Sequence, residues 1–173
     1  MILYQLSVFL HILSAVIWIG GMLFLALVVV PVTRPLPPGE RAALVGAVGR
    51  RFRAVGWACI AVLLVTGVVN TGYRGVTLEN LFTAALWSSP FGTTLALKLG
   101  GVAVMLALSV YHDFAIGPRS VRVLEQATVP GSAALAEARR LRRLASIVGR
   151  AEAILALVVL VLAIMLVRGV PWP

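Results

Sequence analysis

Four stretches of the chain are long and apolar enough to cross a lipid bilayer, and this feature constrains the fold more than any other. A hydrocarbon core about 30 Å thick requires roughly 20 apolar residues per helix. The four stretches cover about residues 4–30, 54–72, 93–115 and 148–167, and each is nearly free of charge. Hydrophobic residues make up 61% of the 173 residues, against roughly 45–50% in soluble domains. We predict an all-α, integral membrane four-helix bundle in which residues 1–173 form a single transmembrane domain.

Basic residues gather in two of the three connections between these spans. The first connection has five arginines against Glu40, and the third has six against Glu125 and Glu137. The opposite side has only Arg74 and Arg168, so the positive-inside rule places both termini outside and the arginine-rich loops in the cytoplasm. We therefore expect a multi-pass protein of the cell (inner or plasma) membrane. The net charge of +9 is then a topology signal with anionic-lipid contacts, and we expect no nucleic-acid partner.

Short interfacial helices are expected in the connections. The basic segment RAALVGAVGRRFRAVGW runs into the second span, and TLENLFTAALWSSP has the apolar residues of a helix that lies along the outer surface. In that segment Thr77 is a candidate cap, and Pro90 is expected to terminate the helix from beyond its end.

Polar residues inside the spans fall into two layers when they are sorted by depth. An ionisable group in a bilayer costs about 2.5–3.5 kcal/mol on insertion scales, so each is a functional candidate. With a rise of about 1.5 Å per residue, His11 and Lys98 both lie roughly 9 Å to the outer side of the midpoints of their spans. Ser14 and Asn70 share this level, and Trp18 lies on the helical face of His11. These residues are the predicted outer layer.

The inner layer is centred on His112, about 12 Å to the inner side of the midpoint of its span. The two histidines are then on the order of 20 Å apart along the membrane normal, so they cannot bind one metal ion, which needs ring nitrogens within about 2 Å. His112 shares its level with four further polar residues: Tyr111, Asp113, Arg150 and Glu152.

Each of these residues also has a structural interpretation. Lys98 can extend its amine to the outer headgroups, His112 with Asp113 can be an interfacial pair, and Arg150 with Glu152 can anchor the fourth span. A histidine in an apolar bundle is the environment in which haem b is held by an axial imidazole, although His11 can also be a hydrogen-bonded structural residue. Copper prefers several sulfur or imidazole ligands at one level, whereas the four methionines are scattered in depth.

Two stretches resemble known membrane families. HILSAVIWIGGMLFLALVVVP is similar to the first span of CopD-like (copper resistance protein D) proteins, and SSPFGTTLALKLGGVAVMLALS resembles one of their later spans. The same positions resemble HemJ-like haem-binding four-helix membrane proteins, whose first helix matches His11 and Trp18. The third helix of that family matches Lys98 and the pair Tyr111-His112, and Glu152 falls near the acidic residue that opens the fourth. The resemblance implies haem b binding with porphyrin oxidation, and the CopD name implies copper uptake or resistance.

The leading hypothesis is a haem b-binding membrane protein with a redox role, either electron transfer or porphyrin or quinol oxidation. His11 is the expected axial ligand of the haem iron and Lys98 a second ligand or a propionate partner, with the site lined by Trp18, Asn70 and Ser14. The inner layer is expected to carry protons, to bind a quinone or porphyrin head, or to hold a second haem through His112, and its members are His112, Arg150, Glu152 and Tyr111. A copper permease and a cofactor-free membrane scaffold are the alternatives. Helix faces with small residues and no predicted partner helix are compatible with a homodimer. The sequence indicates no catalytic residue.

Overall fold

The chain folds into long helices, and no β-strand occurs in the part of the chain that the structure describes. This computed structural model describes residues 1–126 and 133–169. Four helical segments have the length and composition to cross a membrane: Ile2–Val32, Gly39–Gly72, Pro90–Ser120 and Ala136–Arg168. The predicted all-α architecture with four spanning helices is therefore confirmed. The side of the membrane on which the termini lie stays a prediction.

The helices are longer than the apolar stretches because the basic segments beside them continue the same helices. The first span comprises α1 (Ile2–Phe24), the π-helical η1 (Leu25–Val29) and α2 (Val30–Val32). The second is α3 (Pro38–Gly72), which includes the basic segment that precedes the apolar part. The third comprises α5 (Pro90–Val110), the π-helical η3 (Tyr111–Ile116) and α6 (Gly117–Gln126), and the fourth is α7 (Ala133–Arg168).

The outer connection holds two short helices, the 3₁₀ turn η2 (Asn80–Phe82) and α4 (Ala84–Ser88). Thr77 and Asn80 exchange two hydrogen bonds at the start of this region. Pro90 follows the end of α4 at Ser88, as expected of a residue that terminates that helix from beyond its end, and it also occupies the first turn of α5. Proline is favoured there since it lacks an N–H that would need a partner. The side chain of Ser89 caps the same helix by accepting a hydrogen bond from the Gly92 N–H at 3.0 Å.

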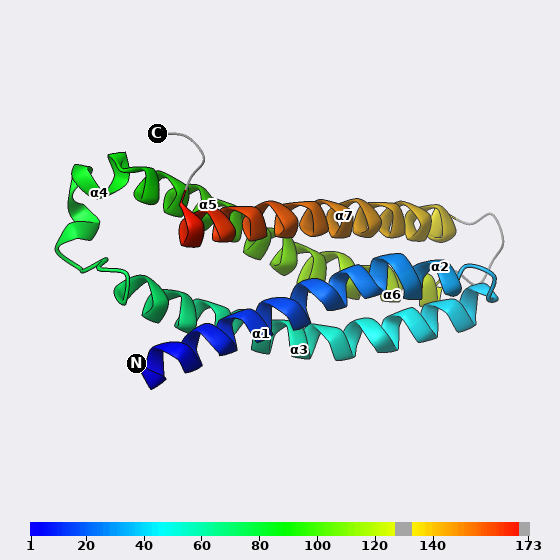
Figure 1. Cartoon of the computed structure of the whole chain (residues 1–173). Helices are drawn as coiled ribbons and strands as arrows, with labels where there is room; N and C mark the ends of the chain where they lie inside the picture. The colour runs from blue at the N-terminus through cyan, green and yellow to red at the C-terminus, as the bar shows by residue number, and fades with distance from the viewer. Residues whose placement is uncertain (127–132, 170–173) are drawn as a thin grey trace.

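The spans pack as two pairs, α1 along α3 and α5 along α7 (Figure 1). One glycine of each Gly-Gly pair lies at a pair interface: Gly21 against the ring of Phe52, and Gly101 against Val159. The absence of a side chain lets these helices approach closely. The two pairs lie further apart at the end that carries both termini (Figure 1).

A central core joins the pairs, and residues from all four spans contribute to it. Its buried members are Trp18, Cys59, Ile60, Met105 and Ala156. A second, smaller cluster packs α6 against the start of α7. The core lies at mid-depth, so it separates the predicted outer layer from the predicted inner layer.

Candidate functional site

The outer layer is built around a contact between α1 and α3. The Nδ1 atom of His11 lies 2.7 Å from the hydroxyl oxygen of Thr66. The Thr66 hydroxyl also lies 2.6 Å from the carbonyl oxygen of Val62, one turn earlier on its own helix. Gly67 leaves room for the imidazole, whose Cε1 atom lies 3.7 Å from where a Cβ would stand.

These two distances decide which nitrogen of His11 carries the proton. Each contact is short enough to require a hydrogen, and a hydroxyl has only one to donate. The Thr66 hydroxyl therefore donates to the Val62 carbonyl and accepts from the Nδ1–H of His11. The lone pair of a neutral His11 is then on Nε2, which is the arrangement in which an imidazole binds a metal while its other nitrogen is held by a protein acceptor.

The outer part of the bundle also contains two cations, Lys98 and Arg74. The charge of Lys98 on α5 acts on His11, and the charge of Arg74, at the outer end of α3, acts on Lys98. A guanidinium nitrogen of Arg74 donates to the carbonyl of Leu166 at 2.7 Å, which ties the end of α3 to the end of α7. Within the described residues, neither cation forms an ion pair. The arrangement favours an anionic group at this level.

Two buried polar atoms of the outer layer lack hydrogen-bond partners among the described residues, and they are Ser7 Oγ and Asn70 Oδ1. Both lie one helical turn outward from the contact between His11 and Thr66. Tyr4 and Tyr73, with ring centroids 5.0 Å apart, close α1 against α3 one turn further out. Buried polar groups are almost always satisfied, so unpaired ones indicate a missing water or ligand.

Of the other predicted outer residues, Ser14 and Trp18 are buried on α1. The indole of Trp18 lies against Gly56 of α3, 3.5 Å from where a Cβ would stand, and it belongs to the central core. Trp18 therefore lies next to the outer layer, on its side toward the middle of the membrane.

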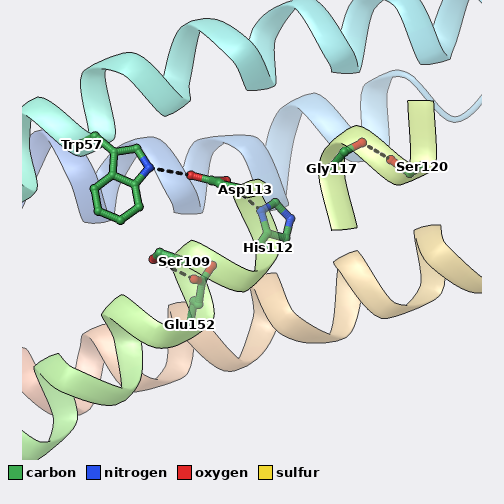
Figure 2. Close-up of polar contacts among 7 residues, drawn as sticks. All are labelled: Trp57, Ser109, His112, Asp113, Gly117, Ser120 and Glu152. Carbon is green, nitrogen blue, oxygen red and sulfur yellow. Dashed lines mark hydrogen bonds and ion pairs between the residues drawn. The ribbon is translucent and has the colours of Figure 1, made fainter. Parts of the chain in front are cut away.

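The inner layer contains two hydrogen-bonded groups (Figure 2). Asp113 accepts from the indole N–H of Trp57 at 3.0 Å through Oδ2 and lies 3.0 Å from Nδ1 of His112 through Oδ1. Because a carboxylate only accepts, Nδ1 of His112 carries a proton. Both His112 and Asp113 lie in the π-helical η3, a kind of turn that is frequent at functional sites.

The second inner group joins α5 to α7. The hydroxyl of Ser109 donates to Oε1 of Glu152 at 2.8 Å, and only 7% of Glu152 is exposed. A buried carboxyl with one hydrogen bond has remaining capacity for a further partner. The charges of Glu152 and of Arg53 on α3 both act on His112.

Two predicted inner residues are not brought into this layer. Arg150 is exposed, and its Nε donates to the carbonyl of Ser146 on its own helix at 3.2 Å. Residues two apart on a helix do not share a face, so Arg150 points away when Glu152 points inward. Tyr111 is 48% exposed, since it precedes His112 by about 100° of helical rotation.

Several residues of both layers were not recognised from the sequence as site residues. Thr66 shares an inward-facing polar stripe of the second span with Asn70, but hydroxyls in membrane helices usually bond their own backbone, so the stripe did not identify it as a partner of His11. The position of Trp57 near the inner end of the second span is typical of an aromatic residue at the membrane interface. Arg53 is one of the arginines of the first connection, which indicate the topology. Ser109 had no signal except that its depth matches that of Glu152.

Sulfur ligands are closer together than the sequence suggested. Cys59 and Met105 are buried in the central core, and Met22 packs against it; only 2% of Met105 is exposed. Met165 lies elsewhere, in a cavity between α5 and the end of α7. Among the described residues, no three side chains of the types His, Cys, Asp and Glu come together as a metal-binding group.

Comparison with known proteins places the chain in a family. Residues 46–166 match the family described as CopD, copper resistance protein D; this range includes Lys98 and the inner layer but not His11. The chain is 34% identical over 118 residues to an uncharacterised protein of Aquifex aeolicus (strain VF5), an alignment that covers 68% of this chain and 73% of that protein. No solved structure matches. The chain belongs to the CopD family of membrane proteins.

Proposed function

We propose that the outer layer binds haem b and that the protein has a redox role in the membrane. The observation that carries this proposal is the orientation of His11, whose Nδ1–H is held by Thr66 at 2.7 Å while Nε2 keeps its lone pair. Axial imidazole ligation uses such a nitrogen. A bound haem supplies one-electron exchange, and His11 would hold its iron.

The charges beside His11 favour haem over a free metal cation. Lys98 and Arg74 lie near each other without an acidic partner in the described part of the chain. Two positive charges in a low-dielectric layer repel an incoming cation and stabilise an anion. Lys98 and Arg74 are therefore the residues that would pair with the haem propionates. Ser7 and Asn70 offer unpaired polar atoms at the same end, and Trp18 and Ser14 would line the site.

The inner layer serves the same redox role in this proposal. Ser109 and Asp113 orient Glu152 and His112, and both oriented groups keep a polar atom for a further partner. This arrangement fits the polar head of a quinone or a porphyrin, or the passage of protons. An oxidoreductase activity, the cytoplasmic position of the arginine-rich loops and a homodimer belong to the proposal as well.

The test is the absorption spectrum of detergent-purified protein, oxidised and then reduced. We expect a Soret band in the unaltered protein and in His112→Ala, and its loss in His11→Ala. Replacement of Lys98 by leucine should weaken haem retention without removing the iron ligand. An unaltered protein without a Soret band refutes the proposal. The cofactor-free scaffold would be favoured if neither the unaltered protein nor the double variant His11→Leu, Lys98→Leu contained haem and the double variant assembled normally.

Copper(I) transport is the second candidate, because one observation favours it. Met22, Cys59 and Met105 meet in or against the central core, and soft sulfur ligands select Cu(I). The family description points the same way. This candidate predicts that cellular copper content depends on the protein and that Met105→Leu abolishes the dependence while the spectrum of the purified protein is unchanged.

A further inference from the structure

An apolar groove runs between the first span and α3. Its volume is about 380 Å³, within the range of small-molecule sites. Each span contributes one stripe at helical spacing, and the lining residues are Ile17, Gly21 and Phe24 on α1, Leu25 at the start of η1, and Val48, Arg51, Phe52 and Val55 on α3. Arg51 is the one charged residue among them.

We propose that this groove binds one acyl chain of an anionic phospholipid, with the phosphate of its headgroup held by Arg51. The proposal does not depend on haem or copper binding. It assigns the groove to the leaflet on the arginine-rich side, because Arg51 belongs to the basic first part of α3 and follows Arg34, Arg41 and Arg50 along the chain.

The dimensions of the groove match one leaflet. Ile17 and Leu25 mark its two ends on the first span, and eight residues of helix span about 12 Å. Half of a hydrocarbon core of about 30 Å is about 15 Å. On α3 the lining runs from Val48 to Val55, so the Arg51 side chain would extend from within the groove toward the headgroups. An acyl chain that continues from there to Ile17 stays within a single leaflet.

The packing of the two helices explains why the hollow exists. Gly21 brings α1 so close to α3 that an added Cβ would lie 2.3 Å from the Phe52 ring. Just beyond this contact, the π-helical η1 begins at Leu25 and changes the direction of the side chains. Phe24 remains 57% exposed and Val55 41% exposed, so the stripes face the bilayer without filling the space between them.

The charge of Arg51 favours an anionic lipid over the other candidates. Arg51 is exposed and has no hydrogen bond or ion pair within the described residues, and guanidinium binds phosphate with two parallel hydrogen bonds. The neighbouring Arg50 instead folds back toward Gly46 of its own helix, 3.4 Å from where a Cβ would stand. A second copy would bring its own Arg51 to the same place in a two-fold interface, and a helix about 10 Å wide does not fit a hollow of this size.

The test uses the full chain reconstituted in phosphatidylcholine bilayers with a trace of spin-labelled phosphatidylglycerol or spin-labelled phosphatidylcholine. The measured quantity is the motionally restricted fraction of each label. One arginine near an anionic surface corresponds to about a fivefold preference, so we expect about that preference for phosphatidylglycerol. Arg51→Gln should remove most of it, whereas the matched control Arg50→Gln should keep it.

A second variant tests the groove itself. Val55→Trp fills the hollow and should reduce the restricted fraction for both lipids, while Val65→Trp, on a lipid-facing position outside the groove, should not. Equal loss of preference in Arg50→Gln and Arg51→Gln would overturn the proposal in favour of diffuse attraction. It would also be overturned if Val55→Trp changed the oligomeric state on dilution and left the restricted lipid fraction unaltered, since a second copy would then occupy the groove.

Discussion

Replacement of Thr66 by valine should loosen the contact between α1 and α3 by about 1 kcal/mol. Valine has nearly the shape of threonine but cannot accept the Nδ1–H of His11, which now bonds the Thr66 hydroxyl at 2.7 Å. Interhelical hydrogen bonds in membranes contribute about 0.6 kcal/mol on average and about 1.7 kcal/mol at most. We expect a value between these because the bond is short and Thr66 is only 6% exposed. The substitution also leaves the imidazole N–H without a partner. The assay is reversible unfolding in mixed detergent micelles, followed by circular dichroism.

Thr71 supplies a matched control for this experiment. Its hydroxyl donates to the carbonyl of Gly67 on its own helix at 2.7 Å, and among the described residues it has no partner on another helix. Thr71→Val should therefore change the free energy of unfolding far less than Thr66→Val, and Thr66→Ser should restore most of the loss. If haem is bound, Thr66→Val should also lower haem affinity by about 10- to 100-fold, as loss of an orienting partner does at metal sites. Equal effects of the two valine substitutions would refute a stabilising hydrogen bond between His11 and Thr66.

Two further predictions concern stability and use the same unfolding assay. Ser109→Ala leaves the buried Glu152 carboxyl without its 2.8 Å hydrogen bond, so it should cost about 1–3 kcal/mol; no measurable cost would mean that water or another group replaces the hydroxyl. Gly92→Ala should sharply reduce the yield of folded protein, because an added Cβ would overlap the carbonyl of Leu86, whereas Gly100→Ala, with nothing within 4 Å, should be nearly neutral. Similar yields of the two alanine variants in size-exclusion chromatography would contradict the packing of α4 on α5.

The fold could be predicted from the sequence because a bilayer leaves few choices for apolar stretches of this length. Spans need about 20 apolar residues, and backbone groups in lipid must be satisfied within helices. The helix ends were less predictable. Pro90 follows the end of α4 and also opens α5, and only the structure shows the second role, through the cap by Ser89. The two π-helical segments have no composition that marks them in advance.

Depth along the membrane sorted the polar residues into two predicted layers, but it did not fix the contacts within them. Depth is a one-dimensional coordinate, so it placed Arg150 beside Glu152 although helical phase separates their side chains. Phase also depends on how the pairs pack, and this decides that Cys59 and Met105 meet in one core. The donor for Glu152 and the acceptor for His11 are hydroxyls, and their role depends on a neighbouring helix that the sequence does not specify.

The central claim is that the Nε2 atom of His11 holds a haem iron. Its most direct test is the amount of haem b per chain, measured as the pyridine haemochrome on protein purified from cells supplied with a haem precursor. The account predicts about one haem per chain for the unaltered protein and for His112→Ala, and almost none for His11→Ala. Haem absent from the unaltered protein, or retained in full by His11→Ala, would contradict it.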